Sequence, residues 1–134
     1  MPTMKIQAWL YRPGKNVSYL LLLRKEERGG YWTPITGHVE KGEKLMDALY
    51  REVKEETGIA DPEYVIDLRV PYRFAKDGEE FEEHSFGVQV ETDSVVLSPE
   101  HQSFEWLTYE AALQRLRWNE QKNALQVLHD MIDV

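Results

Sequence analysis

Three glutamates, Glu52, Glu55 and Glu56, stand close together in a segment with a helical pattern of apolar residues. At about 100° per residue, Glu52 and Glu56 project from one side of a helix, and Glu55 lies at the margin of that side. The same side carries Leu49 and Val53, so it is expected to face the core. Like charges at this spacing repel, and burying a carboxylate without a counter-charge is costly. The three carboxylates therefore need a positive partner in the folded protein.

A divalent cation is the partner that suits these carboxylates best. Mg²⁺ prefers oxygen ligands in octahedral geometry and keeps several waters, which allows carboxylates to share the ion with a phosphate substrate. The chain has no cysteine, so thiolate ligands and a thiol nucleophile are excluded. The structural alternative is a solvated acidic helix end that pairs with Arg51 or Lys54. Residue types alone leave both interpretations open.

The glutamates lie on a predicted helix, residues 43–57, followed by Gly58, which is typical of a helix C-terminus. A polar loop, residues 24–30, and a glycine-bounded segment, residues 37–42, precede this helix. Pro34 lies between them and disfavours both a helix and a central strand. We therefore expect the helix to be reached through loops.

Apolar runs and alternating patterns predict the strands, and turn residues separate them. The predicted strands are residues 5–11, 17–23, 64–70, 80–91 and 104–107, with turns at residues 13–16 and 76–78. Thr108 is expected to cap a mostly helical C-terminal stretch, residues 108–133. This order predicts an α+β fold built as an α/β/α sandwich.

Length and charge narrow the class of protein. The 134 residues fit a single domain, residues 1–134. No apolar run is long enough to predict a membrane span or a secretory signal, so a cytoplasmic protein is expected. The formal net charge of −8 argues against a nucleic-acid polymer as partner, because such binding depends on Lys and Arg. Cations held by carboxylates would still attract a small phosphate-bearing molecule. Monomer and homodimer both stay open.

The segment from Gly37 to Ile59 resembles the signature of the Nudix hydrolases, the Nudix box. It reads Gly, five residues, Glu, seven residues, then Arg-Glu, an apolar residue, any residue, Glu-Glu, any residue, Gly and an apolar residue. The resemblance implies the Nudix fold, a mixed β-sheet between helices with a loop-helix-loop catalytic motif. It also implies hydrolysis of a pyrophosphate bond in a nucleotide-like substrate with Mg²⁺ or Mn²⁺ as cofactor.

The same resemblance assigns roles within the box. Glu52 and Glu56 would be metal ligands, Glu55 would be a ligand or the base that activates water, and the Gly37 carbonyl would be a further ligand. Such ions can neutralise a diphosphate, orient an attacking water and lower its pKa. The other charged pair of the box, Glu43 and Arg51, is expected to form an internal ion pair.

The resemblance continues outside the box through residues 31–34 and 97–107. Similar stretches occur in the dihydroneopterin triphosphate and nucleoside triphosphate pyrophosphatases and in the asymmetric diadenosine tetraphosphate hydrolases. In both groups a glutamate at the position of Glu100 supplies a metal ligand or the general base. Glu100 is therefore our candidate for a catalytic residue outside the box, and an exposed loop glutamate is the alternative.

The two subfamilies differ before the box glycine, where the diadenosine tetraphosphate hydrolases usually carry a Pro-Lys pair. This chain has Thr36 there, which favours a nucleoside or pterin triphosphate such as dihydroneopterin triphosphate, and residues 118–121 favour it as well. Residues 33–34 and 37–40 instead favour cleavage of a dinucleoside polyphosphate. A non-catalytic nucleotide-binding regulatory module is the alternative from another class, although the intact glutamate set argues for catalysis.

Four further residues are candidates for substrate binding. Arg24 and Arg28 could hold distal phosphates through bidentate hydrogen bonds, although charged loop residues are often simply solvated. Trp32 could stack on a base or pterin, although an aromatic residue beside a strand more often belongs to the core. His38 has no metal-ligand spacing to another histidine, so we expect a polar substrate contact.

Overall fold

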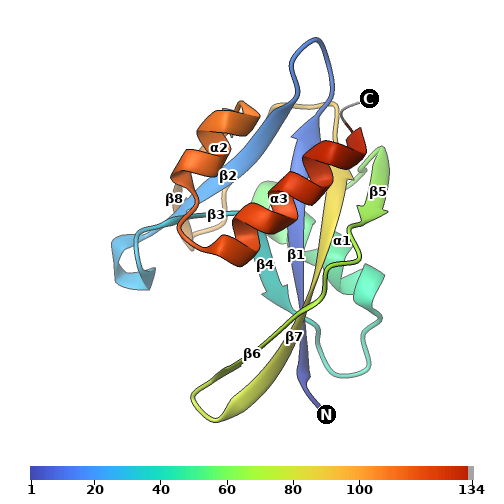
Figure 1. The fold of residues 1–134 in the computed structure, drawn as a ribbon, viewed down its shortest axis with the longest axis vertical. Helices are drawn as coiled ribbons and strands as arrows, with labels where there is room; N and C mark the ends of the chain where they lie inside the picture. The colour runs from blue at the N-terminus through green and yellow to red at the C-terminus, as the bar shows by residue number, and fades with distance from the viewer. Residues whose placement is uncertain (133–134) are drawn as a thin grey trace.

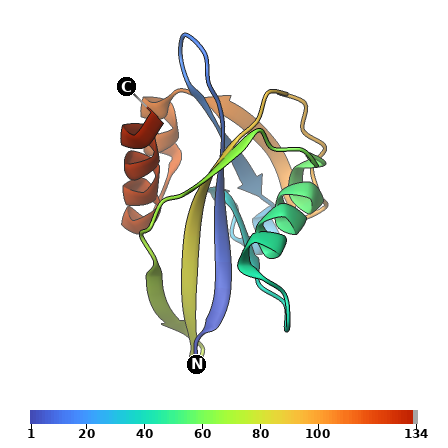
Figure 2. The same cartoon turned by 90° about the vertical axis from the view of Figure 1, so that its right-hand side faces the viewer.

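The computed structural model describes residues 1–132, which fold around one mixed β-sheet of eight strands (Figure 1). Helix α1 covers one face of the sheet, and α2 and α3 cover the other, as the side view shows (Figure 2). The predicted α/β/α sandwich and mixed sheet are therefore confirmed. No helix among these residues is both long and apolar enough to cross a membrane.

Strand β1 lies at the centre of the sheet. It pairs in parallel with β7, and every other strand pairing is antiparallel. The main order is β3-β2-β1-β7-β5, while β4 also pairs with β1, β6 with β7 and β8 with β2. The strands are β1 (Thr3–Arg12), β2 (Ser18–Arg24), β3 (Trp32–Thr33), β4 (Ile35–His38), β5 (Tyr64–Asp67), β6 (Tyr72–Lys76), β7 (Glu79–Gln89) and β8 (His101–Leu107).

Residues 1–132 also form three α-helices and one short 3₁₀ helix: η1 (Glu26–Arg28), α1 (Leu45–Thr57), α2 (Tyr109–Arg115) and α3 (Asn119–Ile132). Gly58 ends α1 in the left-handed conformation, with φ of 77°, as predicted for this glycine. Thr108 caps α2, because its hydroxyl accepts a hydrogen bond from the Ala111 N–H at 3.2 Å. The helical C-terminal stretch is thereby confirmed up to residue 132, and its predicted end at Asp133 lies outside the described residues.

The alternation of side chains along β1 builds a core on each face of the sheet. Ile6 and Leu10 pack with the apolar side of α1, whereas Trp9 and Tyr11 pack with α2 and α3. All four side chains are almost fully buried. The sheet therefore fixes α1, which carries the glutamates, at a defined position relative to β1.

Several element boundaries differ from the predictions. Residues 35–38, expected as loop, form β4, because Pro34 interrupts only the junction between β3 and β4 and leaves the following residues free to pair with β1. The predicted strand 64–70 ends at Asp67, since Arg69 adopts a left-handed φ of 57°, and a separate strand β6 then pairs with β7. Strand β8 begins at His101 rather than residue 104, and α1 begins at Leu45 rather than residue 43.

Candidate active site

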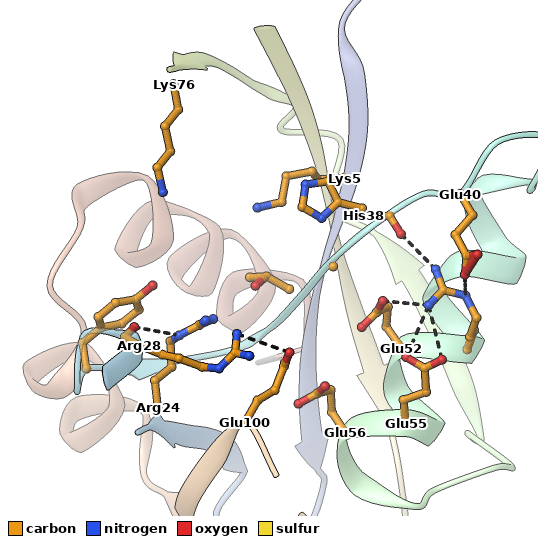
Figure 3. Close-up of a pocket in the computed structure, with 14 residues that line it drawn as sticks. Lys5, Arg24, Arg28, His38, Glu40, Glu52, Glu55, Glu56, Lys76 and Glu100 are labelled. Carbon is orange, nitrogen blue, oxygen red and sulfur yellow. Dashed lines mark hydrogen bonds and ion pairs between the residues drawn. The ribbon is translucent and has the colours of Figure 1, made fainter. Parts of the chain in front are cut away.

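A cleft of about 450 Å³ lies between α1, β4 and the loop that contains η1 (Figure 3). Its walls carry charge of both signs, which is unusual for a core-facing cavity and suits a charged ligand. The carboxylates are Glu40, Glu52, Glu55, Glu56 and Glu100, and the cations are Lys5, Arg24, Arg28, Arg51 and Lys76; Tyr31, Thr36, Gly37 and His38 complete the lining. The structure thus gathers all but one of the predicted site residues into one cleft.

Helix α1 presents its glutamates as the periodicity predicts. Glu52 and Glu56 are 9% and 6% exposed, whereas Glu55, at the margin of this face, is exposed. Burial raises the pKa of Glu52, and the hydrogen bond from Arg51 opposes this effect. Two buried carboxylates one helical turn apart are costly for the fold, so their presence on this face makes them candidates for a functional role.

Gly37 lies directly against the Glu52 side chain. A β-carbon at Gly37 would overlap the carboxyl carbon of Glu52, so a residue with a side chain would displace that carboxylate. Gly37 is held in place by the antiparallel pairing of β4 with β1, opposite Ile6. The glycine is therefore required for space, and it brings the backbone of β4 beside a candidate metal ligand.

Arg51 organises the loop before α1. Its guanidinium donates hydrogen bonds to both carboxylate oxygens of Glu43, at 2.8 and 3.0 Å, and to the His38 carbonyl at 2.9 Å. The hydrogen bonds from Arg51 to the Glu43 carboxylate, followed by one from the Glu40 N–H at 3.0 Å, lower the pKa of Glu43 to about 2. Arg51 also contacts Glu52 at 2.8 Å and Glu55 at 3.3 Å. The predicted ion pair of Glu43 and Arg51 is confirmed, and Arg51 also balances part of the negative charge of the helix.

Glu56 is held by two residues that the sequence analysis did not assign to the site. The Ser98 hydroxyl donates a hydrogen bond to its carboxylate at 2.9 Å, and Nδ1 of His101 lies 2.8 Å from the same oxygen without good hydrogen-bond alignment. Burial by itself raises the pKa of Glu56, but these contacts outweigh it and the net pKa is lowered. Both residues flank Glu100 in the sequence, which is the signal that could have identified them.

The loop side of the cleft carries Glu100 and the two predicted arginines. Arg28 lies 3.5 Å from Glu100, and Arg24 donates a hydrogen bond to the Arg28 carbonyl at 3.2 Å. The Lys25 N–H donates to the Glu100 carbonyl at 3.3 Å, which ties the η1 loop to the start of β8. Arg24, Arg28 and Glu100 therefore face the glutamates of α1 across the cleft (Figure 3).

Trp32 is the one predicted site residue that the structure does not bring to the cleft. It packs against the core on the α2 and α3 face, with the Arg115 guanidinium 4.7 Å from its ring centre. Its neighbour Tyr31 lines the cleft instead and meets Trp118 edge-on at 4.5 Å. Successive residues of an extended chain point to opposite faces, so the choice between Tyr31 and Trp32 depended on a register that the sequence did not fix.

His38 does line the cleft, as expected. Its pKa is lowered by burial and by the nearby Lys5. Lys5 and Lys76 were not among the predicted site residues. Their positions depend on β1 and on the β6–β7 hairpin, which carry no recognisable phosphate-binding motif.

A family model described as the NUDIX domain matches residues 1–129, nearly the whole chain. This chain belongs to the Nudix family. It is accordingly a Nudix pyrophosphohydrolase, and the box of residues 37–59 forms the loop-helix-loop motif of the cleft, from the end of β4 through α1 to Ile59.

Two groups of Nudix relatives share most of their length with the chain. The asymmetrical bis(5'-nucleosyl)-tetraphosphatase of Mus musculus is 31% identical over 121 residues, which cover 84% of this chain and 79% of that protein. The dihydroneopterin triphosphate diphosphatase of Escherichia coli K12 is 27% identical over 106 residues, covering 69% and 71%. An octanoyltransferase of Myxococcus xanthus is 41% identical over 109 residues, which cover 77% of this chain but only 30% of that protein.

Solved structures support the same fold. A binary complex of the Caenorhabditis elegans Ap4A hydrolase superposes with a TM-score of 0.85 at 25% identity, covering 98% of both chains. The E. coli dihydroneopterin triphosphate pyrophosphohydrolase superposes with a TM-score of 0.79 at 24% identity, covering 94% of this chain and 95% of that one. The expected Nudix fold is thereby confirmed.

The chemical type of the donor groups in this Nudix site suits a divalent cation. The carboxylates of Glu52, Glu55, Glu56 and Glu100 and the Gly37 carbonyl are all oxygen donors, which Mg²⁺ and Mn²⁺ prefer. Within residues 1–132, however, no three acidic or histidine side chains already converge as a metal cage. Arg51 instead satisfies Glu52 and Glu55, so a cation would compete with its guanidinium for these two carboxylates.

Proposed function

We propose that this cleft hydrolyses a phosphoanhydride bond in a nucleoside or pterin bearing three or more phosphates. The observation that carries the proposal is the opposition of two charged walls, with the glutamates of α1 on one side and Arg24 and Arg28 on the other. Hydrolysis of a polyphosphate chain needs cationic groups that neutralise its oxygens. It also needs ordered carboxylates that hold metal ions and accept a proton from the attacking water. Both kinds of group meet in this cleft.

Glu52, Glu56, Glu55, Glu100 and the Gly37 carbonyl would hold Mg²⁺ or Mn²⁺. When bound, such an ion neutralises phosphate charge and lowers the pKa of a coordinated water. The arginines would donate hydrogen bonds to phosphate oxygens and orient the chain for in-line attack. Glu55, whose side chain is 54% exposed, and Glu100, at 45%, are both accessible enough to accept a proton from the attacking water.

Two substrate classes fit this proposal. A nucleoside or pterin triphosphate, cleaved to a monophosphate and pyrophosphate, is supported by Thr36, by residues 118–121 and by the E. coli relative. A dinucleoside tetraphosphate is supported by the mouse relative, whose identity and coverage are both higher. His38 and Tyr31 line the cleft beside the arginines and are positioned to contact either substrate.

Product analysis tests the proposed function. The purified protein would be incubated with and without Mg²⁺ with dihydroneopterin triphosphate, a panel of nucleoside triphosphates and diadenosine tetraphosphate. Pyrophosphate with a monophosphate would establish the triphosphate class, whereas ATP with AMP from the dinucleotide alone would establish the second. Metal-dependent binding without any product from these compounds would contradict hydrolysis and favour a nucleotide-binding regulatory module.

A further inference from the structure

Lys5 places a positive charge in the cleft from an unexpected element, the start of β1. It lies opposite His38 in the pairing of β1 with β4, and Gln7 lies opposite Thr36. Thr36 stands where the dinucleotide-cleaving subfamily usually has a lysine. The register therefore brings the Lys5 ammonium to the same wall of the cleft, close to the position that lacks the lysine along the chain.

A buried carboxylate lies beneath this lysine. Oε2 of Glu83 is 3.9 Å from Lys5 Nζ, and the Glu83 side chain is 10% exposed. The parallel pairing of β1 with β7 sets Lys5 directly opposite Glu83, although the two residues are far apart in the sequence. Burial raises the pKa of Glu83, and the charge of Lys5 opposes that effect.

Glu83 is itself fixed by a chain of buried hydrogen bonds. The Gln7 amide donates to Glu83 at 3.1 Å, and the Gln7 carbonyl accepts from the Trp9 indole at 2.7 Å and from the Ser85 hydroxyl at 3.0 Å. A connected network of buried hydrogen bonds of this kind can hold a charge in one place. The Lys5 ammonium is also 5.7 Å from the ring centre of Phe74, which limits its movement further.

The ammonium nevertheless keeps its hydrogen-bond donors available. At 3.9 Å the contact with Glu83 is electrostatic rather than a hydrogen bond, and the Lys5 ammonium donates no hydrogen bond to another group of residues 1–132. Its side chain is 20% exposed and lines the cleft. In Figure 3 the ammonium groups of Lys5 and Lys76 and the guanidinium of Arg28 point into the same space.

We infer that Lys5 is a phosphate-binding residue of this cleft and that Glu83 is a positioning residue that holds it there. The inference rests on the proposed function for the substrate class, a chain of three or more phosphates. Lys5 would donate its N–H groups to the phosphates farthest from the glutamates of α1. The Thr36 side chain then no longer argues against a dinucleoside polyphosphate, because the positive charge is supplied by the neighbouring strand.

The test measures binding rather than turnover, with inorganic tripolyphosphate as the probe in the presence of Mg²⁺. Calorimetric titration would compare the wild type with Lys5→Met, Glu83→Gln and the double variant. Lys15→Met, in the exposed turn after β1, is the matched control for loss of one positive charge. Losing charge-assisted hydrogen bonds should weaken binding about tenfold or more in Lys5→Met, and binding by Lys15→Met should be unchanged.

The double variant separates positioning from a purely structural role. If Glu83 acts through Lys5, Glu83→Gln weakens binding in the wild type but adds little once Lys5 is methionine. Additive losses, or a Lys5→Met protein that binds tripolyphosphate as the wild type does, would overturn the inference. If the wild type binds tripolyphosphate through Lys5 but cleaves no phosphoanhydride, the proposed function alone is contradicted. If the wild type hydrolyses its substrate and Lys5→Met binds tripolyphosphate as tightly as the wild type, the assignment of Lys5 alone is contradicted.

Discussion

Gly37 and Glu52 lie so close together that Gly37 has no room for a side chain: a β-carbon there would overlap the Glu52 carboxyl group. Gly37 sits on β4 and Glu52 on α1, so the strand and the helix meet at this point. Because Gly37 has no side chain, the backbone of a strand and the carboxylate of a helix can share one wall of the cleft.

Gly37→Ala should therefore impair activity more than stability. The added methyl group would push aside the flexible Glu52 side chain, and a displacement of about 1 Å in a catalytic group can cost about a hundredfold in rate. Gly42→Ala is the control, because no atom lies near its β-carbon and only the left-handed φ of 79° is disturbed. Steady-state kinetics with thermal unfolding would show the contrast, and equal activity losses in the two variants would argue against the steric explanation.

Glu56→Gln should abolish turnover while leaving the fold intact. Loss of Glu56, which we propose as a direct metal ligand, should cost more than the roughly 10–100-fold that accompanies loss of outer partners of metal sites. Mg²⁺ should also raise the melting temperature of the wild type, because a ligand that binds only the folded state stabilises it, and it should do so less in the variant. Glu63→Gln, at an exposed position, is the matched control. A variant with unchanged metal-dependent activity would refute the role of Glu56.

The Glu43–Arg51 pair should make stability depend on pH. The folded state lowers the pKa of Glu43 from 4.5 to about 2, so its ionised form stabilises the fold above pH 4.5 and this contribution is lost as the pH falls toward 2. Glu43→Gln lacks the ionisable group. Urea unfolding should show the variant less stable than the wild type near neutral pH, with the difference shrinking between pH 4.5 and 2. A difference that stays constant across this range would exclude the linkage.

Gly87→Ala should destabilise the protein without changing the site. Gly87 lies on β7, and a β-carbon there would overlap a terminal carbon of Leu128, which is fully buried on α3. Overpacking of this kind costs about 1–3 kcal/mol. Chemical denaturation would measure the loss, and kcat of the folded variant should stay close to that of the wild type. Because Leu128→Ala opens space at the same contact, the double variant should lose less stability than the sum of the two single changes.

The parts of the fold that depend on local sequence were predictable. The amphipathic pattern fixed α1 to within two residues, and Gly58 and Thr108 mark helix boundaries where propensity and capping place them. Strand β6 was missed although it pairs with its neighbour β7 across the turn at Asp77 and Gly78, because this short strand is mostly exposed and its apolar signal is weak. Strand β4 was missed because it forms only by pairing with β1, which is distant in the chain. Such pairing depends on the whole sheet rather than on the pattern of a short segment.

The candidate site likewise has some features that local sequence predicts and others that depend on the whole fold. The sequence by itself determined the family, the motif and the side of α1 on which Glu52 and Glu56 lie, because helical periodicity is a property of neighbouring residues. Only the tertiary structure decided that Tyr31 rather than Trp32 lines the cleft and that Ser98 and His101 hold Glu56. It also decided that Lys5 stands over Glu83, because the register of two parallel strands joins residues whose separation along the chain carries no signal.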